Sequence, residues 1–327
     1  IYNTLTVYSG ATLAFFNLNP TPLNKYILLQ DGATILHENG RSLVNGAITL
    51  GGSNTFNVAS GGTNPSLILS NMIDGAGSMI KIGAGTLVLA GAGRHLGPTY
   101  VNAGSLMVDA NIEFSEITVA GGTLGGIGTV YSPVLIATNG RLSPGNLQYA
   151  TANMYFESEL TLRGTTALDI NKSGGFFAGD TVQGFPTISF GGTLQLTLTG
   201  EPLAAGDELH LFNFISASGA FASILPSTPG AGLAWDTSGL AVNGILKVAA
   251  SSPPDFGSVS LAGSDAVFNG SGGPASAEYR VLTSTDLTIP KTNWQPVRTN
   301  LFDANGNFNF ALPIEPATPQ RFFILSY

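Results

Sequence analysis

Histidine is the side chain that most often carries acid–base chemistry or binds a metal near neutral pH, and this sequence contains three, His37, His95 and His210. They lie in three different segments, and no His-x-x-x-His pattern places two ligands on one element. His210 falls on the polar face of an alternating strand, and His95 falls in a loop of glycine and arginine. We therefore expect exposed or structural histidines, with no metal site and no cofactor.

Glycan hydrolysis on a β-helical protein requires two carboxylates about 5 to 9.5 Å apart. Asp74 is the only acidic residue between Arg41 and Met107. The other candidates lie near predicted turns or strand ends, and they are Glu113, Glu116, Glu157, Glu159, Asp207 and Glu208. Two like charges on one strand face form either a functional dyad or an ordinary solvated edge, and we favour the edge. The sequence thus predicts no enzyme, while a polysaccharide-degrading β-helix remains an alternative.

Three further patterns have a chemical and a structural interpretation. Residues 303–307, Asp-Ala-Asn-Gly-Asn, offer oxygen atoms at alternate positions like the start of a calcium loop, but the later glutamate is absent. We expect a hairpin turn there, and weak Ca²⁺ binding stays open. The glycines of 121–128 precede no Lys-Ser/Thr pair, so they indicate turns and not a phosphate site. Trp235, Trp294 and Tyr279 could stack on sugars, but we expect core positions.

Composition excludes several classes of function. The net charge is −8 and no cluster of lysine and arginine occurs, so we expect no nucleic-acid binding. No run of 18 apolar residues predicts a membrane-spanning helix. Cysteine is absent, which removes disulfides and thiol chemistry. The chain starts at Ile1 without methionine or a leader, as we expect of a processed export product or a trimmed piece.

The elements that position these residues are predicted by a repeated Gly-x-Leu step. Its leucines, 18 or 19 residues apart, are Leu87, Leu106, Leu124 and Leu142. Short alternating strands lie between the glycines, and a repeat of this length provides two or three strands with their corners. We therefore predict an all-β chain that begins with a parallel β-solenoid (β-helix), in which the four leucines stack inward. An antiparallel sandwich with evenly spaced hairpins is the alternative.

The remaining sequence predicts two further β regions. The solenoid repeats occupy residues 1–146, and residues 147–248, where the short spacing stops, form a β layer that continues or caps the solenoid. Residues 249–256, Ala-Ala-Ser-Ser-Pro-Pro-Asp-Phe, form a linker. Residues 257–327 contain six short strand candidates, which favour a small immunoglobulin-like β-sandwich.

One stretch resembles a known family. Residues 74–91, with Lys81 and a regular series of glycines, and residues 100–108 after them are similar to the autotransporter-associated β-strand repeat. The resemblance covers most of the chain from about residue 46, and it implies a bacterial, secreted or cell-surface β-solenoid with no common enzymatic activity. A classical autotransporter ends in a membrane barrel of many strands, and from the short region after the linker we expect no such barrel in this sequence.

These observations predict an extracellular structural protein, namely a subunit of a surface or matrix filament such as a biofilm matrix. A solenoid has open ends, and the uncharged N-terminal strand of residues 2–8 could complete the sheet of a second copy head-to-tail. Leu5 and Val7 are the candidate apolar positions of that inter-subunit strand. The alternative is an adhesin or glycan-binding passenger fragment that acts as a monomer.

Overall fold

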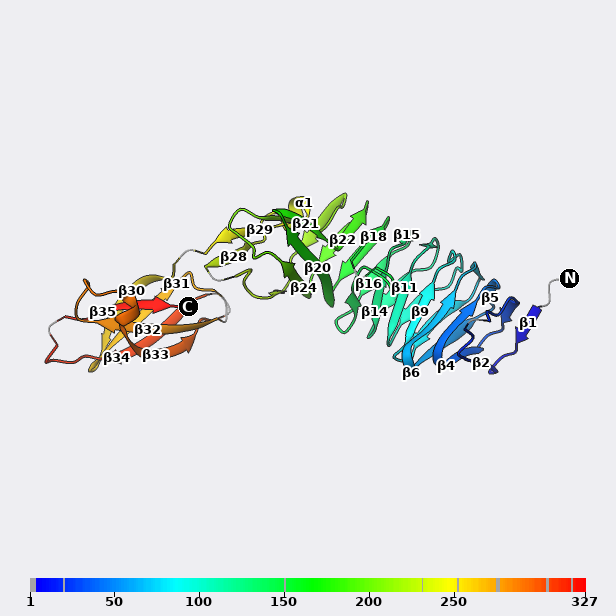
Figure 1. Cartoon of the computed structure of the whole chain (residues 1–327), viewed down its shortest axis with the longest axis horizontal. Helices are drawn as coiled ribbons and strands as arrows, with labels where there is room; N and C mark the ends of the chain where they lie inside the picture. The colour runs from blue at the N-terminus through cyan, green and yellow to red at the C-terminus, as the bar shows by residue number, and fades with distance from the viewer. Residues whose placement is uncertain are drawn as a thin grey trace. The chain divides into compact units, whose positions relative to one another are not determined.

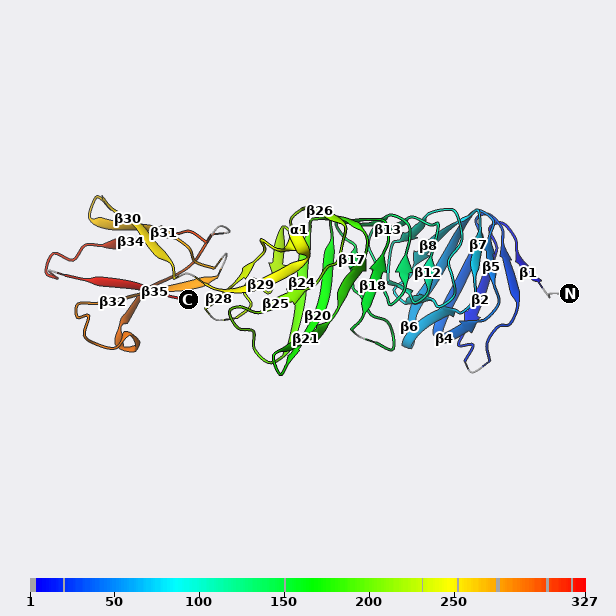
Figure 2. The ribbon, with the colours of Figure 1, turned by 90° about the horizontal axis from the view of Figure 1, so that it is seen from above.

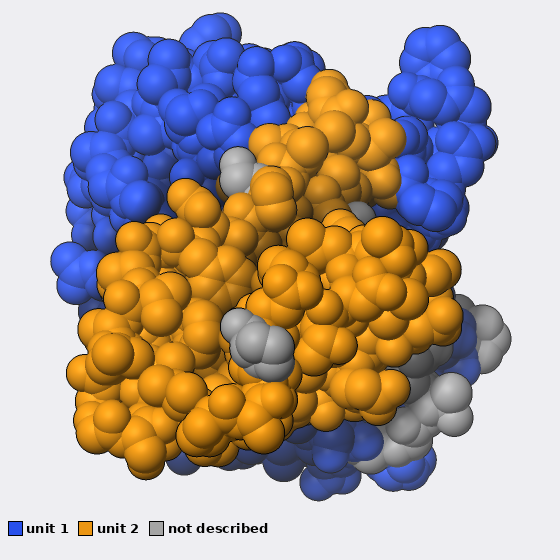
Figure 3. All heavy atoms as spheres, turned by 90° about the vertical axis from the view of Figure 1, so that its left-hand side faces the viewer, with its two compact units in different colours: residues 1–202, 208–226, 236–247 blue, residues 203–207, 227–235, 248–327 orange. Residues whose placement is uncertain are grey.

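The computed structural model describes residues 4–19, 21–149, 151–230, 232–251, 253–274, 277–303, 306–318 and 320–327. The chain is all-β with a large parallel sheet, as the sequence predicted. It divides into two compact units, coloured separately in Figure 3. Unit 1 comprises residues 1–202, 208–226 and 236–247, and unit 2 comprises residues 203–207, 227–235 and 248–327.

Unit 1 consists of three ladders of parallel strands that the chain visits in turn, seen side by side in Figures 1 and 2. The first ladder comprises β1 (Thr4–Val7), β3 (Tyr26–Leu29), β5 (Ile48–Leu50), β7 (Ile73–Gly75), β12 (Asn111–Ile112), β15 (Thr129–Val130), β18 (Asn153–Phe156) and β22 (Thr181–Gly184). Gly93 joins its two halves by bridging Ile73 and Ile112.

The other two ladders share the long strands β4 (Thr34–Val44) and β6 (Ser53–Leu69). The second ladder also contains β2 (Thr12–Phe16), β8 (Ser78–Ile82), β10 (Thr99–Val101), β13 (Ile117–Val119), β16 (Val134–Ile136), β19 (Glu159–Leu162), β23 (Thr187–Phe190) and β26 (Ser216–Gly219). The third also contains β9 (Thr86–Leu89), β11 (Ser105–Val108), β14 (Thr123–Gly126), β17 (Arg141–Leu142), β20 (Thr165–Ser173), β24 (Thr193–Gly200) and β27 (Ser223–Leu225).

The glycine of the Gly-x-Leu step is required by the close approach of successive repeats. Gly104 has φ +64°, and a Cβ atom at this position would lie against the carbonyl oxygens of Gly83 and Gly85, one repeat earlier. A larger residue would therefore clash with the backbone and be strained as well. The sequence motif thus marks the corners at which one repeat turns directly over the next.

Lys81 is a fully buried lysine of unit 1, on the inward face of β8 between Phe56 and Val101 of the neighbouring strands. Its side chain is 0% exposed, and Nζ donates to the carbonyl oxygens of Ile82 at 2.9 Å, Gly83 at 2.8 Å and Ala103 at 3.0 Å. Burial lowers the pKa of Lys81 to about 8, which leaves the ammonium protonated at neutral pH. The side chain fastens a corner of one repeat to the next.

The parallel ladders continue beyond residue 147, although the repeat becomes longer. Leu160 pairs with Ile188, and Thr187 pairs with Ser216, so that nearly thirty residues separate equivalent positions. Part of the added length is an antiparallel hairpin of β20 and β21 (Phe176–Gly179). Four further elements lie outside the ladders. In the sequence, β25 (Glu208–His210) lies between β24 and β26, and β28 (Leu233–Asp236), the four-residue helix α1 (Leu240–Asn243) and β29 (Ile245–Ala250) follow β27. In the described residues no helix is long and apolar enough to cross a membrane.

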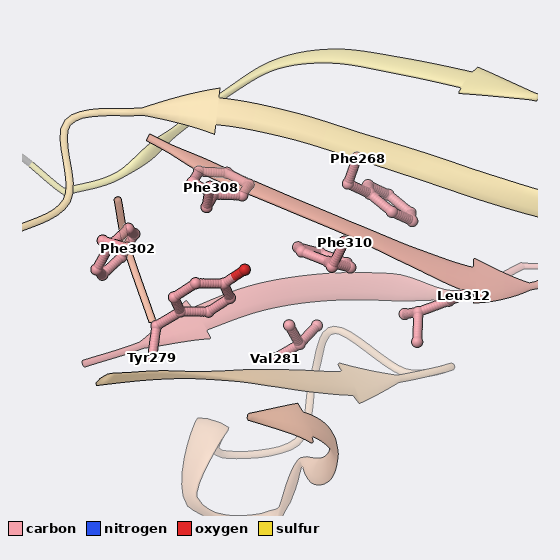
Figure 4. Packing of buried hydrophobic residues seen from close by; sticks show 7 residues of the cluster. All are labelled: Phe268, Tyr279, Val281, Phe302, Phe308, Phe310 and Leu312. Carbon is pink, nitrogen blue, oxygen red and sulfur yellow. The ribbon is translucent and has the colours of Figure 1, made fainter. Parts of the chain in front are cut away.

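Unit 2 contains two antiparallel sheets of three strands each. One sheet has β30 (Asp255–Ala262), β31 (Asp265–Ser271) and β34 (Phe308–Pro313), and the other has β33 (Gln295–Leu301), β32 (Glu278–Ser284) and β35 (Phe322–Ser326), with a short 3₁₀ turn at Lys291–Asn293. Both sheets contribute to one apolar cluster (Figure 4), which contains Phe268, Tyr279, Val281, Phe302, Phe308, Phe310 and Leu312. Five of the six strands contain their predicted candidate in full, and β33 contains all of its candidate except Trp294. Ala249 and Ala250 of the predicted linker belong to β29, and Asp255 and Phe256 belong to β30.

Replacing Lys81 with methionine tests the corner contact. We expect Lys81→Met to lower the free energy of unfolding by about 2–4 kcal/mol, because three buried carbonyl oxygens lose a charged donor while the chain length is kept. Urea denaturation measures this loss. The matched control is Lys25→Met at a half-buried lysine, which should change stability by less than about 0.5 kcal/mol. A Lys81→Met protein as stable as the control would refute the role of the ammonium.

Candidate functional site

The four leucines of the repeat form one column in the third ladder. Leu87 pairs with Leu106, Leu106 with Leu124, and Leu124 with Leu142, and all four side chains are 0% exposed. The column continues to Leu67 before them, and it meets Thr166 after them. These residues are core, and they offer a ligand no reactive group.

The structure does not bring the three histidines together. His95 is fully buried, and its Nε2 lies 2.8 Å from Oγ1 of Thr99, whose hydroxyl lies 2.8 Å from Oγ of Ser115. Burial lowers the pKa of His95 to about 4. His37 is buried on β4, and its pKa is also lowered by burial. His210 is exposed on β25, so the three rings stand in separate environments.

Several acidic side chains are engaged in contacts within the chain. Glu113 forms an ion pair with Arg94 at 2.9 Å, and Glu208 forms one with Lys247 at 2.6 Å. The carboxylate of Asp180 is 1% exposed and accepts hydrogen bonds from the backbone N–H groups of Ala152 at 2.8 Å and Asp169 at 2.9 Å. Within the described ranges, no group of three or more histidines, cysteines or acids is placed to hold a metal ion.

The prediction of a hairpin at residues 303–307 is wrong. The turn connects β33 to β34, which belong to different sheets, and so it is not a hairpin. Asp303 accepts hydrogen bonds from the backbone N–H of Asn307 at 2.8 Å and from its Nδ2 at 2.9 Å. Ala304 and Asn305 lie outside the described residues, so the structure does not describe the full set of oxygen atoms that the Ca²⁺ interpretation needs.

The three aromatic residues considered for sugar binding lie at or near core positions. Tyr279 is 1% and Trp294 6% exposed, and Trp235 is half-buried. Tyr279 and Trp294 are therefore too buried to offer the open ring face that a sugar requires for stacking.

The N-terminal strands are the edges of their ladders. β1 pairs with β3 and β2 pairs with β4, so one side of each strand has no described strand beside it. Val7 is 5% exposed and Leu5 is half-buried, which places both side chains on the inward face of β1. Tyr2 and Asn3 of the predicted inter-subunit strand lie outside the described residues.

Two exposed aromatic features were missed by the sequence analysis. Tyr131, Tyr155 and Phe185 are 47%, 38% and 65% exposed, and they lie in or next to the first-ladder strands β15, β18 and β22. Each ring lies in or directly beside a short strand whose alternate residues are buried. Its position in that alternation is the sequence signal that it faces outward. A groove beside the hairpin β20–β21 contains Phe176 and Phe177, and its signal was the pair Gly174-Gly175 between two strand-like segments.

Two known proteins are similar to parts of the chain. The adhesin BmaC autotransporter of Brucella suis biovar 1 (strain 1330) is 37% identical over 109 residues, which are 32% of this chain and 3% of that protein. An extracellular serine protease of Serratia marcescens is 40% identical over 77 residues, which are 24% of this chain and 7% of the protease. The chain therefore spans a small part of the length of either relative. No family model matches the sequence.

The buried His95 predicts a loss of stability in acid. The folded protein keeps the ring neutral down to about pH 4, whereas the unfolded chain binds a proton below about pH 6.5, so stability falls as the pH falls through this window. Burial raises the pKa of Asp180 to about 6, which has the opposite effect between its unfolded value and pH 6. Because these two pKa shifts have opposite effects on stability, the test compares the wild type with histidine variants at two pH values.

We expect wild type to lose about 2–3 kcal/mol more than His95→Gln when the pH is lowered from 7 to 4.5. Urea denaturation at both pH values measures the difference. His210→Gln, at an exposed position, should retain the wild-type loss. Equal losses in wild type and His95→Gln would show that His95 does not produce the acid sensitivity.

Proposed function

We propose that the chain is an extracellular or cell-surface structural protein of a bacterium, of the autotransporter passenger type, whose three ladders close into a β-solenoid. The observation that carries the proposal is the in-register parallel pairing of the leucine column from Leu87 to Leu142. A stack of this kind forms a rigid, extendable scaffold. The partial similarity to an autotransporter adhesin and to an extracellular protease supports the location.

A structural role without catalysis is part of the proposal. Its support is the use of Asp180, Glu113 and Glu208 in backbone and ion-pair contacts and the separation of the three histidines. One relative is a protease by name, so hydrolysis of proteins is the activity to test first. Turnover of a casein substrate or of neutral and acidic polysaccharides by the purified chain would contradict this part.

We further propose that copies assemble head-to-tail through the edges of unit 1. Strands β1 and β2 contain no charged residue, and Phe16 on β2 is 64% exposed, so the edge lacks the charges that block strand addition. At the other end of the ladders, β26 and β27 each pair with one ladder strand, and α1 packs against β26. Since Val7 already lies in the core of its own chain, the contact would use backbone N–H and C=O groups more than Leu5 and Val7.

The second candidate is an adhesin that binds glycans as a monomer. The observation in its favour is the exposure of Tyr131, Tyr155 and Phe185 along the first ladder, because exposed rings beside polar groups suit sugar stacking. It differs from the first candidate in predicting a monomer at all concentrations.

Charged substitutions on β2 test the assembly. We expect wild type to form polymers as its concentration rises, and Ala14→Lys/Phe16→Lys to stay monomeric, because both positions are exposed on the edge strand and a lysine there opposes pairing. Sedimentation velocity and negative-stain imaging measure this. Leu96→Lys, at a residue 65% exposed in a loop between ladder strands, is the control and should polymerise. A monomeric wild type, or a polymerising double variant, would contradict head-to-tail assembly.

A further inference from the structure

The hairpin of β20 and β21, both labelled in Figure 1, contributes residues to the lining of a groove in unit 1. β21 runs antiparallel to β20, in contrast to the parallel ladders, and the turn between them is Gly174-Gly175, where both residues have positive φ. Residues of β22 and β25 complete the lining. The space has a volume of about 650 Å³, within the usual range of about 300–1,000 Å³ for sites that bind small molecules.

Two phenylalanines of β21 are among the residues that line this groove. The Phe176 side chain is 82% exposed, although such rings are normally buried. The ring of Phe177 is held in place by Lys172, whose Nζ lies 5.6 Å from the ring centroid. Phe176 and Phe177 are successive residues of one strand, so their rings project from opposite faces of the hairpin, and the exposed ring of Phe176 is the one on which a ligand can stack.

The two acidic groups in the lining of the groove, Asp180 and Glu208, already have hydrogen-bond or ion-pair partners within the protein. Both carboxylate oxygens of Asp180 accept backbone N–H groups, and Glu208 is paired with Lys247. The polar groups that remain include the amide of Gln183, whose Nε2 donates to Thr181, and the imidazole of His210. This combination of aromatic rings with amide and imidazole groups suits a ligand that is uncharged and rich in hydroxyl groups.

We propose that this groove binds a neutral oligosaccharide, with a sugar ring stacked on Phe176 and hydroxyl groups bonded to Gln183 and His210. The C–H face of a pyranose is apolar and its rim is polar, which matches the aromatic and polar parts of the lining. A strongly charged glycan would meet no unpaired opposite charge among these lining groups. The site does not depend on assembly, and it goes beyond the structural role proposed above.

The test measures binding of wild type and variants to an array of neutral, acidic and amino-sugar oligosaccharides, followed by calorimetry with the best neutral ligand. We expect Phe176→Ala to weaken binding about tenfold, as loss of an aromatic contact residue commonly does. Because Phe176 is exposed, the variant should unfold at the wild-type temperature. The matched control is Phe114→Ala, an exposed phenylalanine outside the groove, which should bind within about twofold of wild type. Phe185→Ala is measured alongside it, because the second candidate function places a sugar at Phe185.

Three results would overturn the proposal. They are no binding to any neutral glycan, binding that Phe176→Ala leaves unchanged, and loss of binding in Phe185→Ala but not in Phe176→Ala, which would place the sugar on the first ladder. Sedimentation of the same samples reports assembly separately, so a monomer that binds the glycan through Phe176 would contradict the filament and retain the groove.

Discussion

The ladder strands of unit 1 satisfy their backbone hydrogen bonds through parallel strands about one repeat away along the chain. The other features of the unit follow from this constraint. A residue in one repeat must fit the residue at the same position in the next, which explains why Leu87, Leu106 and Leu124 are alike. The corner must be equally compact, which explains Gly104 and the lysine that binds the carbonyl oxygens beside it. Added residues can enter only where they leave the pairing intact, as in the hairpin of β20 and β21.

The same constraint connects the fold to both proposed activities. A ladder has an end, and at β1 and β2 the described chain provides a partner on one side only, so a second copy could supply the missing strand. The outward side chains, in contrast, do not affect the pairing and can vary freely. Exposed rings such as Tyr131 and the groove at Phe176 lie in this variable layer, where a binding function can be added to a scaffold.

Much of the fold could be predicted because its signals are local. The spacing of glycine and leucine predicted an all-β chain with parallel strands, and alternation located the strands of unit 2. The features that the sequence did not predict correctly depend on contacts between residues that are distant in the chain. The turn at Asp303 has ordinary turn residues, but the strands on either side pair in different sheets, which turn chemistry does not reveal. The groove at Phe176 is lined by the β20–β21 hairpin, β22 and β25. The position of the hairpin against these strands depends on how the ladder strands stack, so no local sequence pattern predicts the groove.

The register of the stack can be measured directly, because the chain contains no cysteine. Ser105 and Thr123 are partners on β11 and β14, and neighbouring strands lie about 4.8 Å apart, within the range that a disulfide spans. Oxidation of the double variant Ser105→Cys/Thr123→Cys should form an intramolecular disulfide in high yield, while Ser105→Cys/Thr118→Cys, closer in sequence but not paired, should not. A disulfide in the second variant and none in the first would contradict parallel, in-register stacking.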